Sequence, residues 1–161
     1  MSLNTEKIAK RRRKHHFRIE SPEIEESLEK ACIYVAQYWS DILRLNLFNT
    51  NVQNFSQLLV TKTNPLNRKL IDRFQNELAQ LIFDEISALE YSSENPNEHC
   101  LDFDRWVGCW EHGPNTYLAE VCQALSISFL YFPSQTGWYV NPGRVINRFG
   151  EIRMVGRVIV K

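Results

Sequence analysis

Residues 21–47, SPEIEESLEKACIYVAQYWSDILRLNL, decide how this chain folds. Ser21 can accept hydrogen bonds from the free amides of a helix start, and Pro22 suits the first helical position. Acidic residues follow in the first turn, where the positive end of the helix dipole favours them. Apolar side chains then recur every three or four residues, which predicts one long helix with a single apolar face. That face consists of Ile24, Leu28, Cys32, Val35, Trp39 and Ile42.

A second stretch, residues 65–91, repeats this design. Asn64 and Pro65 predict its start, and its apolar side chains again follow a helical spacing. Both predicted helices, 22–47 and 65–91, are apolar on one side only, so each needs a partner. Pairing them as an antiparallel hairpin is the simplest solution. The second apolar face consists of Leu66, Leu70, Phe74, Leu78, Leu81, Ile82, Ile86 and Leu89.

After residue 100 the pattern changes from helical spacing to alternation. Leu101, Phe103 and Val107 alternate with polar residues, which predicts a strand, and residues 118–125 have the spacing of a short helix. From residue 127 onward, segments rich in Val, Ile and aromatics are separated by short turns, which favours antiparallel strands. The expected strands are 127–132, 137–141, 144–149 and 151–160. The predicted fold class is therefore α+β, with two long antiparallel helices packed on a C-terminal antiparallel β-meander.

Length and composition indicate one packed domain. The chain has 161 residues, of which 43% are hydrophobic, enough to form a core without metals or disulfides. We expect residues 1–20 to form a basic, flexible arm and residues 21–161 to form a single α+β domain. The N-terminus lacks the apolar run of a signal peptide, and no apolar run reaches the length of about 18 residues that spans a bilayer.

Cysteine use supports a reducing compartment. Few cysteines occur for this length, and they are scattered, which predicts free thiols and a cytoplasmic location with no membrane contact. They are Cys32, Cys100, Cys109 and Cys122.

The net charge of zero hides a partition along the chain. Residues 1–18 carry seven Lys or Arg and one Glu, whereas residues 19–110 carry fifteen acids and seven bases. The uninterrupted cations of the arm repel one another and gain by contacting phosphates or an acidic surface. An ordinary solvated tail, folded back on the acidic helices, is the alternative. The candidate contacts in the arm are Lys10, Arg11, Arg12, Arg13, Lys14 and Arg18.

A second basic element lies in the expected meander. Arg144 and Arg148 fall on one face of a predicted strand, and Arg153 and Arg157 do the same on the next. Single-strand binders use cations interleaved with aromatic side chains to grip the backbone and stack bases, although aromatics in a meander also pack in cores. The nearby aromatics are Tyr131, Trp138, Tyr139 and Phe149.

One acidic pair suggests a metal. Asp102 and Asp104 are two residues apart, so on a strand both would point to one face and could hold Mg²⁺ or Mn²⁺, with Glu111 or His112 completing the site. Such a site suits phosphodiester hydrolysis, but a solvated strand face has the same pattern. For zinc, only Cys109 and His112 have the spacing of a ligand pair. No nucleophile elbow or phosphate-binding loop occurs in the sequence.

Together these features predict a small, non-enzymatic binding or regulatory protein without a cofactor. Its basic arm would contact nucleic acid or an acidic partner. One alternative is a metal-dependent phosphodiesterase or nuclease that uses Asp102 and Asp104, and only this alternative requires a divalent metal. A further alternative is a protein–protein interaction module that docks through its acidic helical half.

Overall fold

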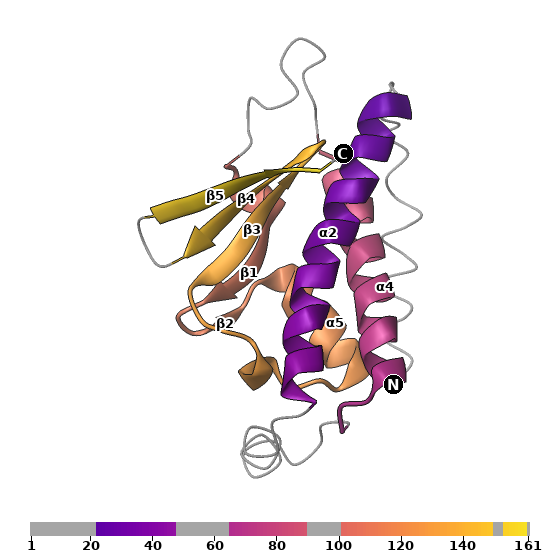
Figure 1. Cartoon of the computed structure of the whole chain (residues 1–161), viewed down its shortest axis with the longest axis vertical. Helices are drawn as coiled ribbons and strands as arrows, with labels where there is room; N and C mark the ends of the chain where they lie inside the picture. The colour runs from indigo at the N-terminus through magenta and orange to yellow at the C-terminus, as the bar shows by residue number, and fades with distance from the viewer. Residues whose placement is uncertain (1–21, 48–64, 90–100, 150–152, 161) are drawn as a thin grey trace.

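The computed structural model describes residues 22–47, 65–89, 101–149 and 153–160. Two long helices, α2 (Pro22–Asn46) and α4 (Arg68–Ile86), precede a five-stranded antiparallel sheet (Figure 1). A short helix, α5 (Thr116–Leu125), lies between the second and third strands. The predicted α+β fold class, with two long N-terminal helices, is confirmed. The strands are β1 (Trp106–Trp110), β2 (Gly113–Pro114), β3 (Thr136–Asn141), β4 (Arg144–Phe149) and β5 (Arg153–Ile159).

The two long helices form the expected antiparallel hairpin. Arg44, near the end of α2, donates hydrogen bonds of 3.1 Å to Asp72 and 2.7 Å to Gln75, both near the start of α4. The second helix begins at Arg68 because Asn67, not the predicted Asn64, caps it by accepting a 2.9 Å bond from the amide of Leu70. Neither helix has an apolar stretch long enough to cross a membrane, within the part of the chain that the structure describes.

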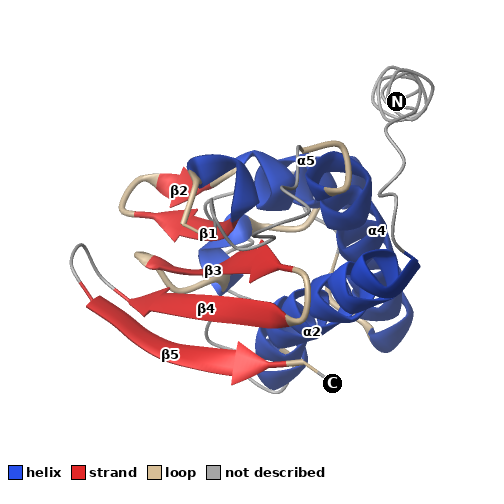
Figure 2. Ribbon diagram, turned by 90° about the horizontal axis from the view of Figure 1, so that it is seen from above, coloured by secondary structure: helices blue, strands red, loops and turns tan. Residues whose placement is uncertain are grey.

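Most of the core lies between the helices and one face of the sheet. The strand order is β2-β1-β3-β4-β5, and α2, α4 and α5 all lie on one side of it (Figure 2). We call the face toward the helices the inner face and the opposite one the outer face. Alternation along the strands sends Val107, Trp138, Val140 and Val145 into the main core on the inner face. The ring of Trp138 packs edge-on against Tyr38 of α2.

Two of the predicted strand segments are short 3₁₀ helices instead. The expected strand from Leu101 begins only at Trp106, because Phe103–Arg105 forms a 3₁₀ turn closed by a bond from the Arg105 amide to the Asp102 carbonyl. The expected strand 127–132 contains the turn Phe129–Tyr131, in which the Ser128 hydroxyl accepts a bond from the Leu130 amide. In each segment local hydrogen bonds replace strand pairing.

A smaller cluster packs on the outer face of the sheet. Its buried members are Trp106, Tyr139 and Ile146, which come from three neighbouring strands, and Trp110 packs against them. Trp106 lies over the paired glycines Gly108 and Gly137, where a Cβ atom on either would meet the indole. The absence of side chains on these glycines thus lets the indole lie close to the backbone.

Candidate functional site

The outer face of β4 carries the two arginines that the alternation predicted. Arg144, Ile146 and Arg148 occupy alternate positions of this strand, opposite Asn141, Tyr139 and Gly137 of β3. Because the pairing of β3 with β4 is regular, both guanidinium groups belong to the outer face. Four residues of extended chain separate their Cα atoms by about 13 Å. Both side chains are half-buried.

Neighbouring groups hold each arginine in a different way. Arg148 donates a 3.1 Å hydrogen bond to the Tyr139 hydroxyl, whose ring is buried beside Trp106. The Nε of Arg144 is buried and has no hydrogen-bond partner among the described residues. One cation is therefore anchored through an aromatic side chain, whereas the other has a buried donor without a partner among the described residues.

The pairing of β5 with β4 is not the regular alternation from which Arg153 and Arg157 were predicted to share one face. Arg157 lies opposite Ile146, but Arg153 lies opposite Phe149, because the register shifts between Asn147 and Arg148. This irregularity interrupts the two-residue alternation from which one common face was predicted. The side chains of Arg153 and Arg157 are outside the described part of the chain, as are the candidate arm residues 10–14 and Arg18.

Most of the aromatic side chains predicted near these arginines pack in the buried clusters of the protein. Tyr131 and Trp138 belong to the main core, and Tyr139 is only 4% exposed in the outer-face cluster. Accessible ring surface is instead found on Phe103, which is 71% exposed and lies 5.7 Å from the ring of Trp110. Tyr131, Trp138 and Tyr139, which the sequence suggested for base stacking, are thus largely buried. The side chain of Phe149 is outside the described residues.

The proposed metal ligands do not come together. Asp102 and Asp104 lie before β1, at the N-cap and within the 3₁₀ turn rather than on a strand, so the prediction that both share one strand face is wrong. Glu111 and His112 lie in the turn after β1, beyond five strand residues that span about 17 Å. No group of three or more potential ligands gathers among the described residues.

The described cysteines are free thiols in packed surroundings. Cys32, Cys109 and Cys122 are all buried. Burial raises the pKa of Cys109 to about 12, and burial also raises the pKa values of Cys32 and Cys122. These thiols therefore remain protonated at neutral pH and are weak nucleophiles, which argues against covalent catalysis by Cys109. Cys100 is outside the described residues.

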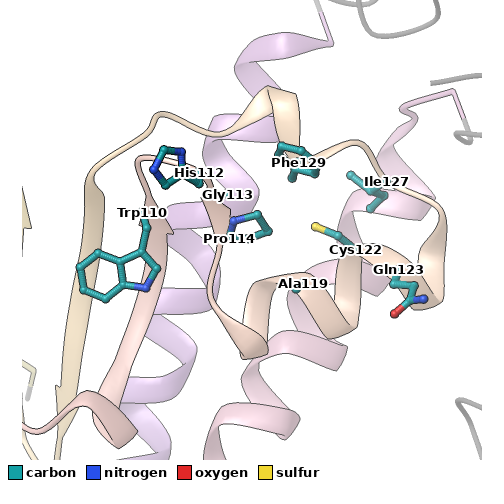
Figure 3. Close-up of a pocket in the computed structure, with 9 residues that line it drawn as sticks. All are labelled: Trp110, His112, Gly113, Pro114, Ala119, Cys122, Gln123, Ile127 and Phe129. Carbon is teal, nitrogen blue, oxygen red and sulfur yellow. The ribbon is translucent and has the colours of Figure 1, made fainter. Parts of the chain in front are cut away.

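A pocket of about 650 Å³ that the sequence did not predict lies at the β2 edge of the sheet. Its first wall is the hairpin joining β1 to β2, its second is α5, and its third is the segment after α5. Figure 3 shows Pro114, Cys122, Ile127 and Phe129 arranged around a common space. The other lining residues are Trp110, His112, Gly113, Ala119 and Gln123.

Local hydrogen bonds fix the pocket walls relative to one another. The side chain of Asn115 accepts bonds from the amides of Gly108 and Leu118 and donates to the Trp106 carbonyl, which joins the hairpin to the start of α5. At the other end of α5, Ser126 adopts a left-handed conformation with φ of 54°. Its neighbour Ile127 then turns back, with its amide 2.9 Å from the Cys122 carbonyl. The sequence signals of these walls are the turn Gly113-Pro114 and the cap Asn115.

Comparison of the chain with protein-family models, with curated proteins and with solved structures found no significant match. The geometry of the described residues is therefore what bears on function.

Proposed function

We propose that this chain is a non-enzymatic binding protein that contacts nucleic acid, or else an acidic protein, through its basic arm and the outer face of β4. The observation that carries the proposal is the state of Arg144. The residue is half-buried, and its buried Nε has no hydrogen-bond partner among the described residues. An unsatisfied buried donor costs about 1–3 kcal/mol, and more when it is charged. An anionic oxygen that reached this group would remove that cost.

Arg148 extends the same face. Because its guanidinium is bonded to the hydroxyl of a buried tyrosine, part of its rotamer freedom is already lost before a ligand arrives. Guanidinium groups bind phosphate and carboxylate oxygens in a planar, two-pronged geometry that a lysine cannot reproduce. Arg144 and Arg148, on one strand face, would therefore contact a partner that carries several anionic groups in a row.

Nucleic acid is the first candidate because of the basic arm. Residues 10–14 are five consecutive cations, and each cation that neutralises a phosphate releases condensed counterions. A repeating phosphate backbone could engage the arm and the two arginines at once. An acidic protein would need a matching array of carboxylates. Titrating the protein with oligonucleotides and, separately, with an acidic peptide distinguishes the two kinds of partner.

The test is fluorescence anisotropy of labelled oligonucleotides, single-stranded and duplex, at several salt concentrations. Replacing both Arg144 and Arg148 with Ala should weaken binding and reduce the salt slope by about 1.4 on a single strand or about 1.8 on duplex. Deleting residues 1–18 should flatten the slope further. Replacing Arg68 and Lys69, two exposed cations on α4, with Ala is the matched control and should leave the slope unchanged.

The proposal fails in two separable ways. Undetectable binding of oligonucleotides and of a poly-glutamate peptide at low salt would refute it entirely. A slope that responds to the arm deletion but not to Arg144→Ala/Arg148→Ala would confine binding to the arm. In that case the outer face of β4 would have no part in it.

A further inference from the structure

The pocket between the β1–β2 hairpin, α5 and Phe129 lies apart from the arginines of β4. We infer that this pocket binds a small apolar molecule that is neutral or positively charged. Its volume of about 650 Å³ lies within the range of about 300–1,000 Å³ found for small-molecule sites. The inference does not depend on the proposed function, because it uses other elements and the opposite charge preference.

The chemistry of the walls defines the body of the ligand. Pro114, Cys122, Ile127 and Phe129 supply apolar surface from three separate segments (Figure 3). Burying apolar ligand surface against them contributes roughly 25 cal/mol per Å². The side chains of His112 and Gln123 are the exposed hydrogen-bonding groups of the lining. A ligand with one polar group could orient itself on either of them.

The walls of the pocket offer no Lys or Arg to an anionic ligand. Residues 111–135, which supply every lining residue except Trp110, contain two carboxylates and no Lys or Arg. These carboxylates are Glu111, in the hairpin turn, and Glu120, on α5. An anionic ligand would therefore find no cation on these wall segments, whose charged side chains are both carboxylates. A neutral or cationic ligand does not need one.

The edge of the sheet disfavours an extended peptide as the occupant. β2 contains only two residues, and its second residue, Pro114, has no amide hydrogen to donate. A peptide that bound by strand addition would find few backbone partners beside the pocket. A compact molecule that fills the space between the walls needs none.

The experiment uses three probes that share one ring, namely indole, tryptamine and indole-3-acetate, in ¹H–¹⁵N NMR titrations of the full chain. Indole and tryptamine should shift the amide signals of Ala119, Gln123 and Ile127. Indole-3-acetate, with the same ring and a negative charge, should bind roughly two- to fivefold more weakly than tryptamine. Equal affinity of the anionic and cationic probes would overturn the charge preference.

Matched substitutions on α5 assign the site. Ala119→Phe places a phenyl group in the pocket and should weaken tryptamine binding by about tenfold or more, since it takes the volume that the probe needs. Ala124→Phe makes the same change at an exposed position of this helix outside the lining and should leave binding unchanged. If Ala119→Phe disrupts folding, Phe129→Ala removes a wall at a side chain that is already 45% exposed. It should weaken binding several-fold.

Three results would overturn the inference. No shift with any probe at millimolar concentration would exclude the ligand class. Shifts that persist unchanged in both Ala119→Phe and Phe129→Ala would place the probe elsewhere. Broadening of the same amide signals with rising protein concentration, before any probe is added, would make a second copy of the chain the occupant instead.

Discussion

Gly137→Ala should destabilise this protein, although the same change at an unobstructed position would stabilise it. Gly137 on β3 pairs with Gly108 on β1, and the indole of Trp106 lies across both. A Cβ atom at position 137 would lie 2.5 Å from Cη2 of Trp106 and 2.8 Å from the Cα of Gly108. Because Trp106 is only 2% exposed, its ring has little room to move away.

Two opposing effects determine how much Gly137→Ala changes the unfolding free energy. Replacing Gly by Ala lowers the entropy of the unfolded chain and by itself stabilises by about 0.4–1 kcal/mol. Inserting a methyl group into a packed cluster costs about 1–3 kcal/mol. The expected net effect is a loss of about 1–2 kcal/mol of unfolding free energy. For a chain of this length, that loss lowers the Tm by about 2–8 °C.

The assay is urea denaturation followed by tryptophan fluorescence, combined with calorimetry. In a Trp106→Leu background, Gly137→Ala should lower the unfolding free energy by less. The coupling energy between positions 106 and 137 should be about 0.5–3 kcal/mol. Gly143→Ala is the matched control, because Gly143 has a φ of 68° and the nearest atom to a new Cβ is 3.9 Å away. Its cost comes from backbone conformation, so it should not change when Trp106 is replaced.

Gly108→Ala tests the same geometry from the other strand. There the nearest atoms belong to the backbone of β3, the Thr136 carbonyl oxygen at 2.5 Å and the Gly137 Cα at 2.6 Å. Trp106→Leu should therefore rescue Gly108→Ala less well than Gly137→Ala. A stabilising effect of Gly137→Ala, or equal costs with and without the indole, would refute the reasoning.

Two further predictions concern other parts of the fold. Ser126→Gly should stabilise by about 1 kcal/mol, because a residue other than glycine is strained in the left-handed conformation that Ser126 adopts at the end of α5; a lower Tm for this variant would contradict the assignment. Stability should also fall in alkali. Burial raises the pKa of Cys109 to about 12 from 9.0, so the folded state keeps a proton that the unfolded state loses between these values. The contribution of Cys109 to the unfolding free energy should be constant below about pH 9 and fall as the pH rises toward about 12. Urea titrations across this range should show a shallower fall for Cys109→Ala, and parallel curves for the two proteins would count against the prediction.

The helices could be predicted because their signals are local. The apolar spacing in residues 22–47 and 65–91 is the spacing that buries Leu28, Trp39 and Phe74 in the structure. The start of α4 differs by three residues from the predicted start at Pro65, because Asn64 and Asn67 are both good caps in sequence. Only the tertiary structure selects between two such candidates.

The strands were harder to predict from the sequence, because a short apolar run can form a strand or a helical turn. Residues 127–132 are as rich in apolar and aromatic side chains as β3, yet Ser128 caps a 3₁₀ turn there. Burial does not separate the two cases, since Phe132 packs against Trp39 and Phe74 as a core strand residue would. The alternation on β4 was predicted correctly, but the register of β5 includes a shift that no two-residue pattern contains.

The two candidate sites also differ in how local their sequence signals are. Arg144 and Arg148 could be predicted as a pair because both lie on one regular strand, so two-residue alternation alone places them on one face. The pocket needs three segments to converge, and their directions depend on the bonds of Asn115 and on the left-handed Ser126. A serine gives little sequence signal for that conformation, which glycine usually supplies. A site that depends on one such residue can be recognised only when the path of the backbone is known. Because Asn115 and Ser126 hold the pocket walls and not β4, substituting either should alter the pocket and leave the arginine face intact.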